Sequence, residues 1–196
     1  ERVINMLNTK YLIFPGDDNK PIAQENPRAL GNAWFVREIL IVPDADAEIE
    51  ALGSFDPSKT AIIDKRFEPL LAGFSPDSSD RSGSINMLGY KPNHLMYEYE
   101  LTKSRLAVFS EVYYRPGWNA YIDGEPVEHF RVNYILRAMV LPEGKHKLEF
   151  KFEPKLFEVG ENIALSCSFL LLLLFFGALF KEIKSVLHEE EIKAEQ

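Results

Sequence analysis

Cysteine is nearly absent from this sequence, and clusters of basic residues are absent altogether. The single cysteine, Cys167, cannot form a disulfide within the chain, so cysteine usage does not reveal the redox compartment. Lys and Arg number 22 against 30 Asp and Glu, and no basic stripe occurs. Because a nucleic-acid site needs clustered cations to neutralise phosphates, we expect no nucleic-acid partner.

Motifs that carry catalysis or bind metals are also missing. The chain has no HExxH, paired CxxC, glycine-rich phosphate loop or GxSxG. Its four histidines lie far apart without ligand spacing, which favours surface or turn positions: His94, His129, His146 and His188. Asp17-Asp18 beside Pro15-Gly16 is oxygen-rich, but such loops are common and rarely bind calcium. We therefore predict no catalytic residue, metal site or cofactor, and a self-contained hydrolase is disfavoured.

Charge is missing from one long stretch, Ile163–Phe180, which reads IALSCSFLLLLLFFGALF. An 18-residue helix at about 1.5 Å per residue spans roughly 27 Å, close to the hydrocarbon core of a bilayer. The alternative is a buried helix of a soluble protein, but such helices usually carry a polar stripe. We therefore predict a transmembrane helix at 161–181, with the lipid bilayer as a partner.

The residues flanking this stretch predict its orientation. Lys181 and Lys184 follow directly, with Lys193 beyond them, so the positive-inside rule predicts a cytoplasmic tail at 182–196. Lys151 and Lys155 on the other side weaken this bias. The bulk of the chain is then extracytoplasmic or periplasmic, at the cell (inner) membrane. No signal peptide precedes it and the chain starts at a glutamate, so we expect a piece of a longer protein whose upstream transmembrane domain is a partner.

The stretch 85–154 has the pattern of a β-sandwich. Leu95, Tyr97, Tyr99 and Leu101 alternate with polar residues, as expected of a half-buried strand. The next segment is more continuously apolar, which indicates a strand covered on both faces. Asp123-Gly124 predicts a tight hairpin turn. The predicted strands are His94–Leu101, Leu106–Tyr114, Trp118–Ile122, the returning Glu128–Val132, Tyr134–Leu141 and Lys145–Phe152.

The first 74 residues are less regular and predict a small α+β subdomain. Strands are expected at Tyr11–Phe14, Ala33–Val42 and Thr60–Asp64, and a short helix at Asp44–Leu52 with Asp44 as its cap. Ser, Asp, Pro and Gly then predominate, which predicts a linker or loop at 75–84. The predicted fold is therefore mainly β, a β-sandwich, with an amino-terminal α+β subdomain and one carboxy-terminal transmembrane helix.

One aromatic cluster is a candidate glycan-binding site around Pro116-Gly117. Its members are Tyr113, Tyr114, Arg115, Trp118, Asn119 and Tyr121. Aromatic rings can stack on the apolar face of a sugar while Arg115 or Asn119 donates hydrogen bonds. The alternative, which is favoured, is that the rings fill the core, Trp118 above all. Arg131 and Arg137 are expected to pair with acidic neighbours at the surface.

Several segments, taken in order, resemble the carboxy-terminal portion of the bacterial YfhO-like membrane proteins. No single motif is diagnostic, but their joint order is fairly specific and covers the chain from residue 5 to the apolar helix. The segments are NMLNTKYLI (Asn5–Ile13), LGNAWFV (Leu30–Val36), YYRPGW (Tyr113–Trp118), AYIDG (Ala120–Gly124), RVNYILR (Arg131–Arg137) and LPEGKH (Leu141–His146).

The resemblance implies a large multi-span protein, similar to glycosyltransferases that use lipid-linked sugars and implicated in decorating cell-envelope polymers. The catalytic acidic residue of such enzymes is expected in an early extracytoplasmic loop, which this sequence does not contain, so none is assigned here. The leading hypothesis is a non-catalytic extracytoplasmic accessory domain, with envelope glycan as a candidate ligand. The alternative is a structural or protein-interaction module with no carbohydrate role.

Overall fold

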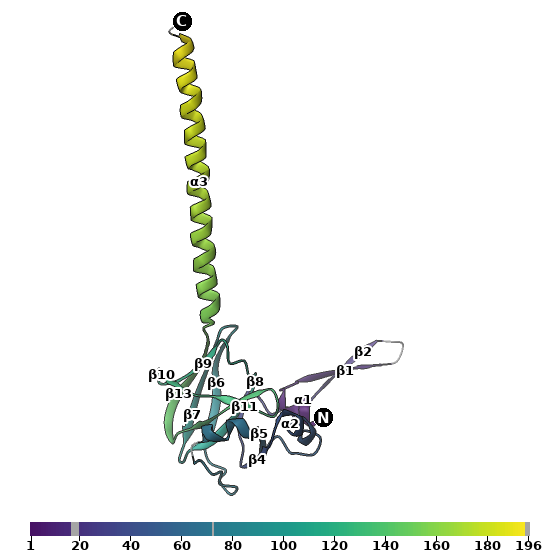
Figure 1. Cartoon of the computed structure of the whole chain (residues 1–196). Helices are drawn as coiled ribbons and strands as arrows, with labels where there is room; N and C mark the ends of the chain where they lie inside the picture. Colours follow the sequence, from purple (N-terminus) through teal and green to yellow (C-terminus); the bar gives the residue numbers. More distant parts are fainter. Residues whose placement is uncertain (17–19, 72, 195–196) are drawn as a thin grey trace. The chain divides into compact units, whose positions relative to one another are not determined.

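The computed structural model describes residues 1–16, 20–71 and 73–194, with Asp17, Asp18 and the His188 side chain outside the described part. The chain divides into two compact units, residues 1–153 and residues 154–196. The first unit is mostly β-sheet with small α/β elements at its amino end, and the second contains one long apolar helix (Figure 1). The predicted fold class is confirmed.

Two antiparallel sheets form the sandwich of the first unit (Figure 1). One has five strands in the order β10-β9-β13-β7-β6: β10 Glu125–Val127, β9 Trp118–Ile122, β13 Gly144–Phe152, β7 His94–Leu101 and β6 Ser84–Lys91. The other has four strands in the order β11-β12-β8-β3: β11 Phe130–Val132, β12 Leu136–Leu141, β8 Arg105–Val112 and β3 Ala33–Phe35.

An aromatic core lies between these sheets. The rings of Tyr97, Phe109 and Phe150 meet edge-to-face, with centroids 5.0 to 6.2 Å apart. Such edge-to-face pairs stabilise a core beyond the area they bury. Tyr97 belongs to the residues of β7 that alternation predicted to face inward, and Leu95, Tyr99 and Leu101 are buried with it.

The four-stranded sheet is buried on both of its faces. Ala107 and Phe109 of β8 pack into the core shared with the five-stranded sheet. Leu106 and Val108 of the same strand belong to a second core, which includes residues of the amino-terminal elements. This double burial confirms the prediction for the segment that begins at Leu106, and it explains why that strand is continuously apolar.

The second core is closed by short amino-terminal elements. They are α1 Arg2–Met6, β4 Glu38–Val42, α2 Ala45–Ala51, β5 Thr60–Asp64 and the 3₁₀ helix η2 Lys65–Leu71. β4 and β5 pair in parallel. Asp44 caps α2 as predicted, because its carboxylate accepts a hydrogen bond from the Ala47 N–H at 2.9 Å.

The single strand predicted at 33–42 is wrong, because the structure has two strands there. β3 pairs with β8, and Val36 N–H still donates to the Leu106 carbonyl at 3.1 Å. The Arg37 N–H instead donates to the carbonyl of Lys59, the residue before β5, at 2.7 Å. The chain therefore passes from one sheet to another within two residues, which an unbroken apolar pattern does not reveal.

The Asp123-Gly124 turn is confirmed, but the predicted returning strand is wrong. Both turn residues have positive φ, 50° and 90°, and the strand that follows is β10 at Glu125–Val127. Phe130–Val132 crosses to the other sheet as β11 and pairs with β12. The reason is that Phe130 and Val132 bury their side chains in the second core, to which the four-stranded sheet contributes residues and the five-stranded sheet does not.

Two further strands have no counterpart in the predictions. β6 has a register shift between Met87 and Gly89, and its exposed positions hold Leu88 and Tyr90 while a half-buried position holds Gly89, so its residue types do not alternate as those of a typical strand do. β2 Pro21–Glu25 pairs with β1 Tyr11–Pro15 in a separate two-stranded ribbon. The predicted division at 75–84 stays a prediction, although β3 and β8, from either side of it, share one sheet.

The second unit contains α3, Lys155–Ala194, which includes the predicted span. Within the described residues, one helical segment is long and apolar enough to cross a membrane, Val159–Glu182. No residue in its most apolar stretch is buried. The hydroxyls of Ser166 and Ser168 donate to carbonyls four residues earlier, at 2.7 and 2.8 Å. These bonds satisfy the two hydroxyls within the helix, so they do not oppose a lipid environment.

Candidate functional site

The loop that joins β8 to β9, together with β9 itself, carries the predicted aromatic cluster. Its Gly117 carbonyl accepts a hydrogen bond from the Glu153 N–H at 2.7 Å. A Cβ on Gly117 would collide with the Phe152 ring, so glycine is required there for the ring to lie against the backbone. The loop is thereby attached to the last residues of β13.

Tyr114 and Trp118 meet at Phe152. The Trp118 and Phe152 ring centroids are 5.4 Å apart, and Tyr114 lies 6.4 Å from Phe152. Trp118 is half-buried and packs against the core between the sheets, whereas 53% of Tyr114 is exposed. Arg115 is exposed beside it. Of the aromatic residues in this loop, Tyr114 is thus the one that projects into solvent.

Tyr113 lies apart from these rings. It packs edge-to-face against Phe67 of η2 at 5.9 Å and against His129 at 5.4 Å. It is half-buried, and burial raises the pKa of its hydroxyl. Tyr113 therefore packs with residues of two other elements, in a different place from Tyr114.

Asn119 and Tyr121 lie on the outer face of the five-stranded sheet, because they alternate with the inward Trp118 on β9. Both donate hydrogen bonds to one carboxylate oxygen of Glu153, at 2.8 and 2.7 Å. The Lys151 ammonium lies 4.9 Å from the centroid of the Tyr121 ring. The six predicted residues thus occupy three places.

Arg137 is buried behind Trp118, so the prediction of a surface ion pair is wrong. Only 2% of it is exposed, and its guanidinium carbon lies 4.1 Å from the Trp118 centroid and 5.2 Å from that of Phe150. Its Nε donates to the Val112 carbonyl at 2.9 Å. Burial lowers the pKa of Arg137 to about 10, and the two rings stabilise the cation by cation–π contacts.

His129 and Glu111 share this environment with Arg137. Burial, followed by the charge of Arg137, lowers the pKa of His129 to about 4, so the imidazole is neutral at physiological pH. Burial raises the pKa of Glu111, opposed by Arg137. The expectation of a surface or turn position for His129 is therefore wrong. None of these side chains carries a spacing motif, because β8, β12 and the β10–β11 connection bring them together only in the folded chain.

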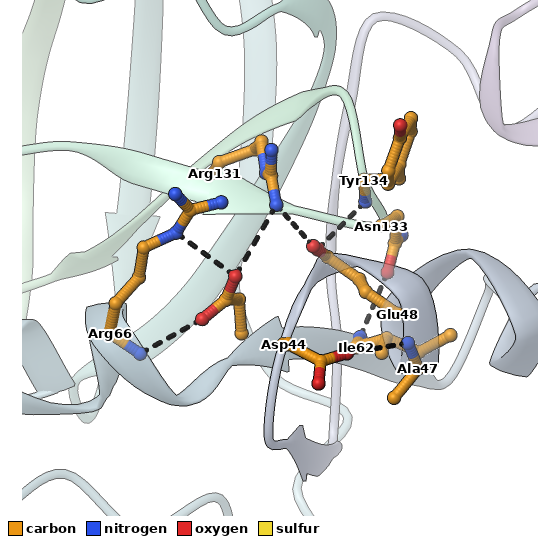
Figure 2. A network of polar contacts seen from close by, with 9 residues as sticks. Asp44, Ala47, Glu48, Ile62, Arg66, Arg131, Asn133 and Tyr134 are labelled. Atoms are coloured by element: carbon orange, nitrogen blue, oxygen red, sulfur yellow. Dashed lines mark hydrogen bonds and ion pairs between the residues drawn. The ribbon is translucent and has the colours of Figure 1, made fainter.

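A second polar network joins α2, β5 and the β11–β12 turn, and sequence reasoning did not find it (Figure 2). Glu48 is fully buried and accepts hydrogen bonds from Arg131 at 2.5 Å and from the Tyr134 N–H at 2.8 Å. One carboxylate oxygen of Asp64 lies 3.6 Å from a guanidinium nitrogen of Arg131 and 3.0 Å from Nε of Arg66. Glu48 looked like an ordinary helix carboxylate in the sequence, and only its contact with a distant turn shows its role.

The turn in this network is held in a strained backbone conformation. Asn133 and Tyr134 both have positive φ, 49° and 71°. Asn133 exchanges two hydrogen bonds with Ile62 of β5, its N–H donating at 2.9 Å and its side-chain oxygen accepting at 2.8 Å. A positive φ is unfavourable for a tyrosine, so the buried hydrogen bonds of Asn133 and Glu48 must hold the turn in place.

Among the described residues, no group of three His, Cys, Asp or Glu side chains is arranged to hold a metal ion. An apolar groove of about 420 Å³ lies beside the strained turn, lined by residues that include Met6, Ile49 and Tyr134.

Part of the chain matches a known protein family. Residues 80–164 match the family described as bacterial membrane protein YfhO. No curated protein matches the chain, and no solved structure does. The matched stretch contains β6 to β13 and the beginning of α3, so it includes the whole five-stranded sheet, leaves out β3 of the four-stranded sheet, and enters the candidate span.

Proposed function

We propose that this chain is the carboxy-terminal portion of a YfhO-like membrane protein, and that residues 1–153 are a non-catalytic accessory domain held at the membrane by α3. The observation that carries the proposal is the family match over residues 80–164, which continues from the sandwich into the apolar helix. The side chains of the span, among them Phe169 and Leu172, are exposed to solvent in the described part of their unit. Lipid is the environment in which such a helix is stable.

The proposed domain lies outside the cytoplasm. Lys181 and Lys184 follow the apolar run, which favours a cytoplasmic end there. The sandwich would then occupy the extracytoplasmic side of the cell (inner) membrane, beside the upstream transmembrane domain of the same protein. This placement suits an accessory to a glycosyltransferase-like protein that acts on cell-envelope polymers.

Glycan binding by this domain is supported best on the outer face of the five-stranded sheet. Tyr121 presents a half-buried ring there, with Asn119, Lys151 and Glu153 around it. A ring surrounded by donors and acceptors can bind the apolar face and the hydroxyls of one sugar. Trp118, in contrast, packs in the core, where it supports the sheet instead of a ligand.

A protein-interaction role is the alternative, and the ribbon of β1 and β2 favours it. Tyr11, Ile13, Phe14 and Ile22 are exposed on this ribbon, which pairs with no other strand in the described residues. An isolated two-stranded ribbon is only marginally stable in water, so an apolar one suits burial against a partner. The membrane domain of the same protein is the partner that this alternative predicts.

A glycan array with the full chain in detergent separates the two roles. The accessory-domain proposal expects saccharide binding that Tyr121→Ala abolishes, while Tyr90→Ala, on the exposed part of β6, leaves it unchanged. A thermal transition equal to that of the wild type shows that Tyr121→Ala is folded. No response to any envelope saccharide would refute glycan binding and favour the interaction module.

The orientation is tested in cells with single cysteines in a Cys167→Ala background. A cysteine at Glu143, in an exposed turn of the sandwich, should react with a membrane-impermeant maleimide added outside intact cells. A cysteine at Lys184, after the span, should react only after permeabilisation. The reverse pattern would refute the extracytoplasmic placement.

A further inference from the structure

The end of the sandwich that carries Tyr114 is covalently close to the candidate span. The first unit ends at Glu153, and the span begins at Val159. Six residues extend over at most about 21 Å, and less here because α3 is helical from Lys155 at about 1.5 Å per residue. Glu153 is therefore at most about 21 Å along the chain from the residue at which the proposed span begins.

Two loops are attached to this end by hydrogen bonds from the last residues of β13. The Glu153 N–H donates to Gly117 at 2.7 Å, which holds the loop of residues 113–117. The Phe152 N–H donates to the Asn93 carbonyl at 2.9 Å, which holds the β6–β7 turn. The Phe152 ring also packs against Tyr114. Both loops are therefore hydrogen-bonded to the residues that lead directly into the second unit.

The exposed side chains of these loops suit the interface of a bilayer. Tyr114 is 53% exposed, and Arg115 and Lys91 are exposed with it. Tyrosine is enriched at membrane–water interfaces, where its ring meets the acyl boundary and its hydroxyl stays hydrated. Arginine binds phosphate oxygens in a bidentate manner. The nearby carboxylate of Glu153 accepts hydrogen bonds from Asn119 and Tyr121.

We infer that the Tyr114–Arg115 segment enters the lipid headgroup layer, where the Tyr114 ring lies at the acyl boundary and Arg115 binds phospholipid phosphate. This inference rests on the membrane span of the proposed function. It assigns Tyr114 and Arg115 to lipid, and leaves the outer-face residues Asn119 and Tyr121 as the candidate glycan contacts. The six residues of the predicted cluster are thus divided among the lipid-facing loop, the outer face of the five-stranded sheet and packed positions within the domain.

The test measures the depth of the loop in a bilayer. The full chain with Cys167→Ala and Pro116→Cys is labelled with a fluorophore and reconstituted into phosphatidylcholine–phosphatidylglycerol nanodiscs that contain a headgroup spin-labelled lipid. Pro116 is exposed, directly follows Arg115 and lies two positions from Tyr114. The matched control is Glu143→Cys, beside Gly144, which lies about 26 Å from Phe152 along β13 at 3.3 Å per residue.

We expect strong quenching at position 116 and none at position 143. Changing Tyr114 and Arg115 to serine in the Pro116→Cys protein should remove the quenching, while the thermal transition shows that the domain remains folded. Equal quenching at positions 116 and 143, or quenching that persists in the serine variant, would overturn the inference.

A third label separates failure of the inference from failure of the proposed span. Phe169→Cys lies in the exposed apolar run of α3, and acyl-chain spin-labelled lipid should quench a fluorophore there. Quenching at position 169 without quenching at 116 overturns the lipid contact of the loop and leaves the span intact. Absence of quenching at position 169 overturns the span, and the lipid contact with it.

Discussion

Removing the buried carboxylate of Glu48 should destabilise the sandwich domain substantially. Glu48→Ala deletes the acceptor of two hydrogen bonds, from Arg131 at 2.5 Å and from the Tyr134 N–H at 2.8 Å. Of the carboxylates of Glu48 and Asp64, Arg131 would retain that of Asp64, 3.6 Å away, and the Tyr134 N–H would lose its acceptor in a strained turn. The substitution therefore leaves the Arg131 guanidinium and the Tyr134 N–H without the carboxylate that accepts their hydrogen bonds.

The magnitude follows from the burial of the two partners. Breaking a buried ion pair by removing one member costs about 3–5 kcal/mol, and the 18% exposure of the Arg131 side chain places this case at about 3 kcal/mol. Burial raises the pKa of Glu48 in spite of Tyr134 and Arg131, so the charged carboxylate is incompletely compensated. Glu48→Gln, which keeps an acceptor without the charge, should cost less than Glu48→Ala.

Thermal unfolding of the full chain in detergent measures this effect. Both tryptophans, Trp34 and Trp118, lie in the first unit, so their emission reports its unfolding without a signal from α3. A loss of about 3 kcal/mol lowers the Tm by roughly 6–12 °C for a domain of this size. The matched control is Glu50→Ala, an exposed glutamate on the same helix, with an expected change within about 0.5 kcal/mol.

Two results would refute the reasoning. Glu48→Ala could lower the Tm no more than Glu50→Ala does, which would mean that the network contributes no stability. Alternatively, the costs of Glu48→Ala and Arg131→Ala could add fully in the double variant. Residues in one network should instead show a coupling of at least about 0.5 kcal/mol.

Three further substitutions test other parts of the first unit. Because His129 is neutral when folded, with its pKa lowered from 6.5 to about 4, the unfolded chain binds more protons between these values and stability falls as the pH falls through that window. His129→Phe should remove about 3 kcal/mol of this loss. If the wild type and the variant lost the same unfolding free energy between pH 7 and pH 4, the prediction would be contradicted. Asp44→Ala should cost about 1 kcal/mol by uncapping α2, whereas Asp44→Asn, which can still cap, should be nearly neutral in the same melting assay. Gly117→Ala should cost about 1–3 kcal/mol by displacing Phe152, whereas Gly53→Ala meets its nearest atom at an ordinary 3.4 Å; equal Tm values would exclude a required glycine at 117.

The strands of the carboxy-terminal half were predictable because their faces have different environments. Alternation along β7 and β13 reflects one face on the core and one in solvent, and Leu148 and Phe150 are buried as this pattern requires. β6 escaped prediction because Leu88 and Tyr90 occupy exposed positions and Gly89 a half-buried one, so residue types do not follow the alternating burial. β11 was assigned to the wrong sheet because three residues contain too little pattern to indicate a partner.

The candidate site was predictable only as a set of residue types. The sequence places Tyr113, Tyr114 and Trp118 within six positions, but their rings enter three different environments. The direction of each ring depends on where β8 ends and β9 begins, and a shift of one residue reverses the face of a strand. For the same reason Arg137, predicted at the surface, faces the core.

By itself, the amino-acid sequence determined the apolar helix, the two-residue alternation of the main strands, the Asp123-Gly124 turn and the Asp44 cap. These features depend on hydrophobicity and backbone preferences within a few neighbouring residues. Only the tertiary structure decided that β3 and β8 share a sheet, that Glu48 is buried beneath the β11–β12 turn, and that the loop of Tyr114 is hydrogen-bonded to Glu153 at the end of β13. Each of these depends on contacts between residues more than about thirty positions apart in the chain, whose pairing is selected by the burial of a shared core.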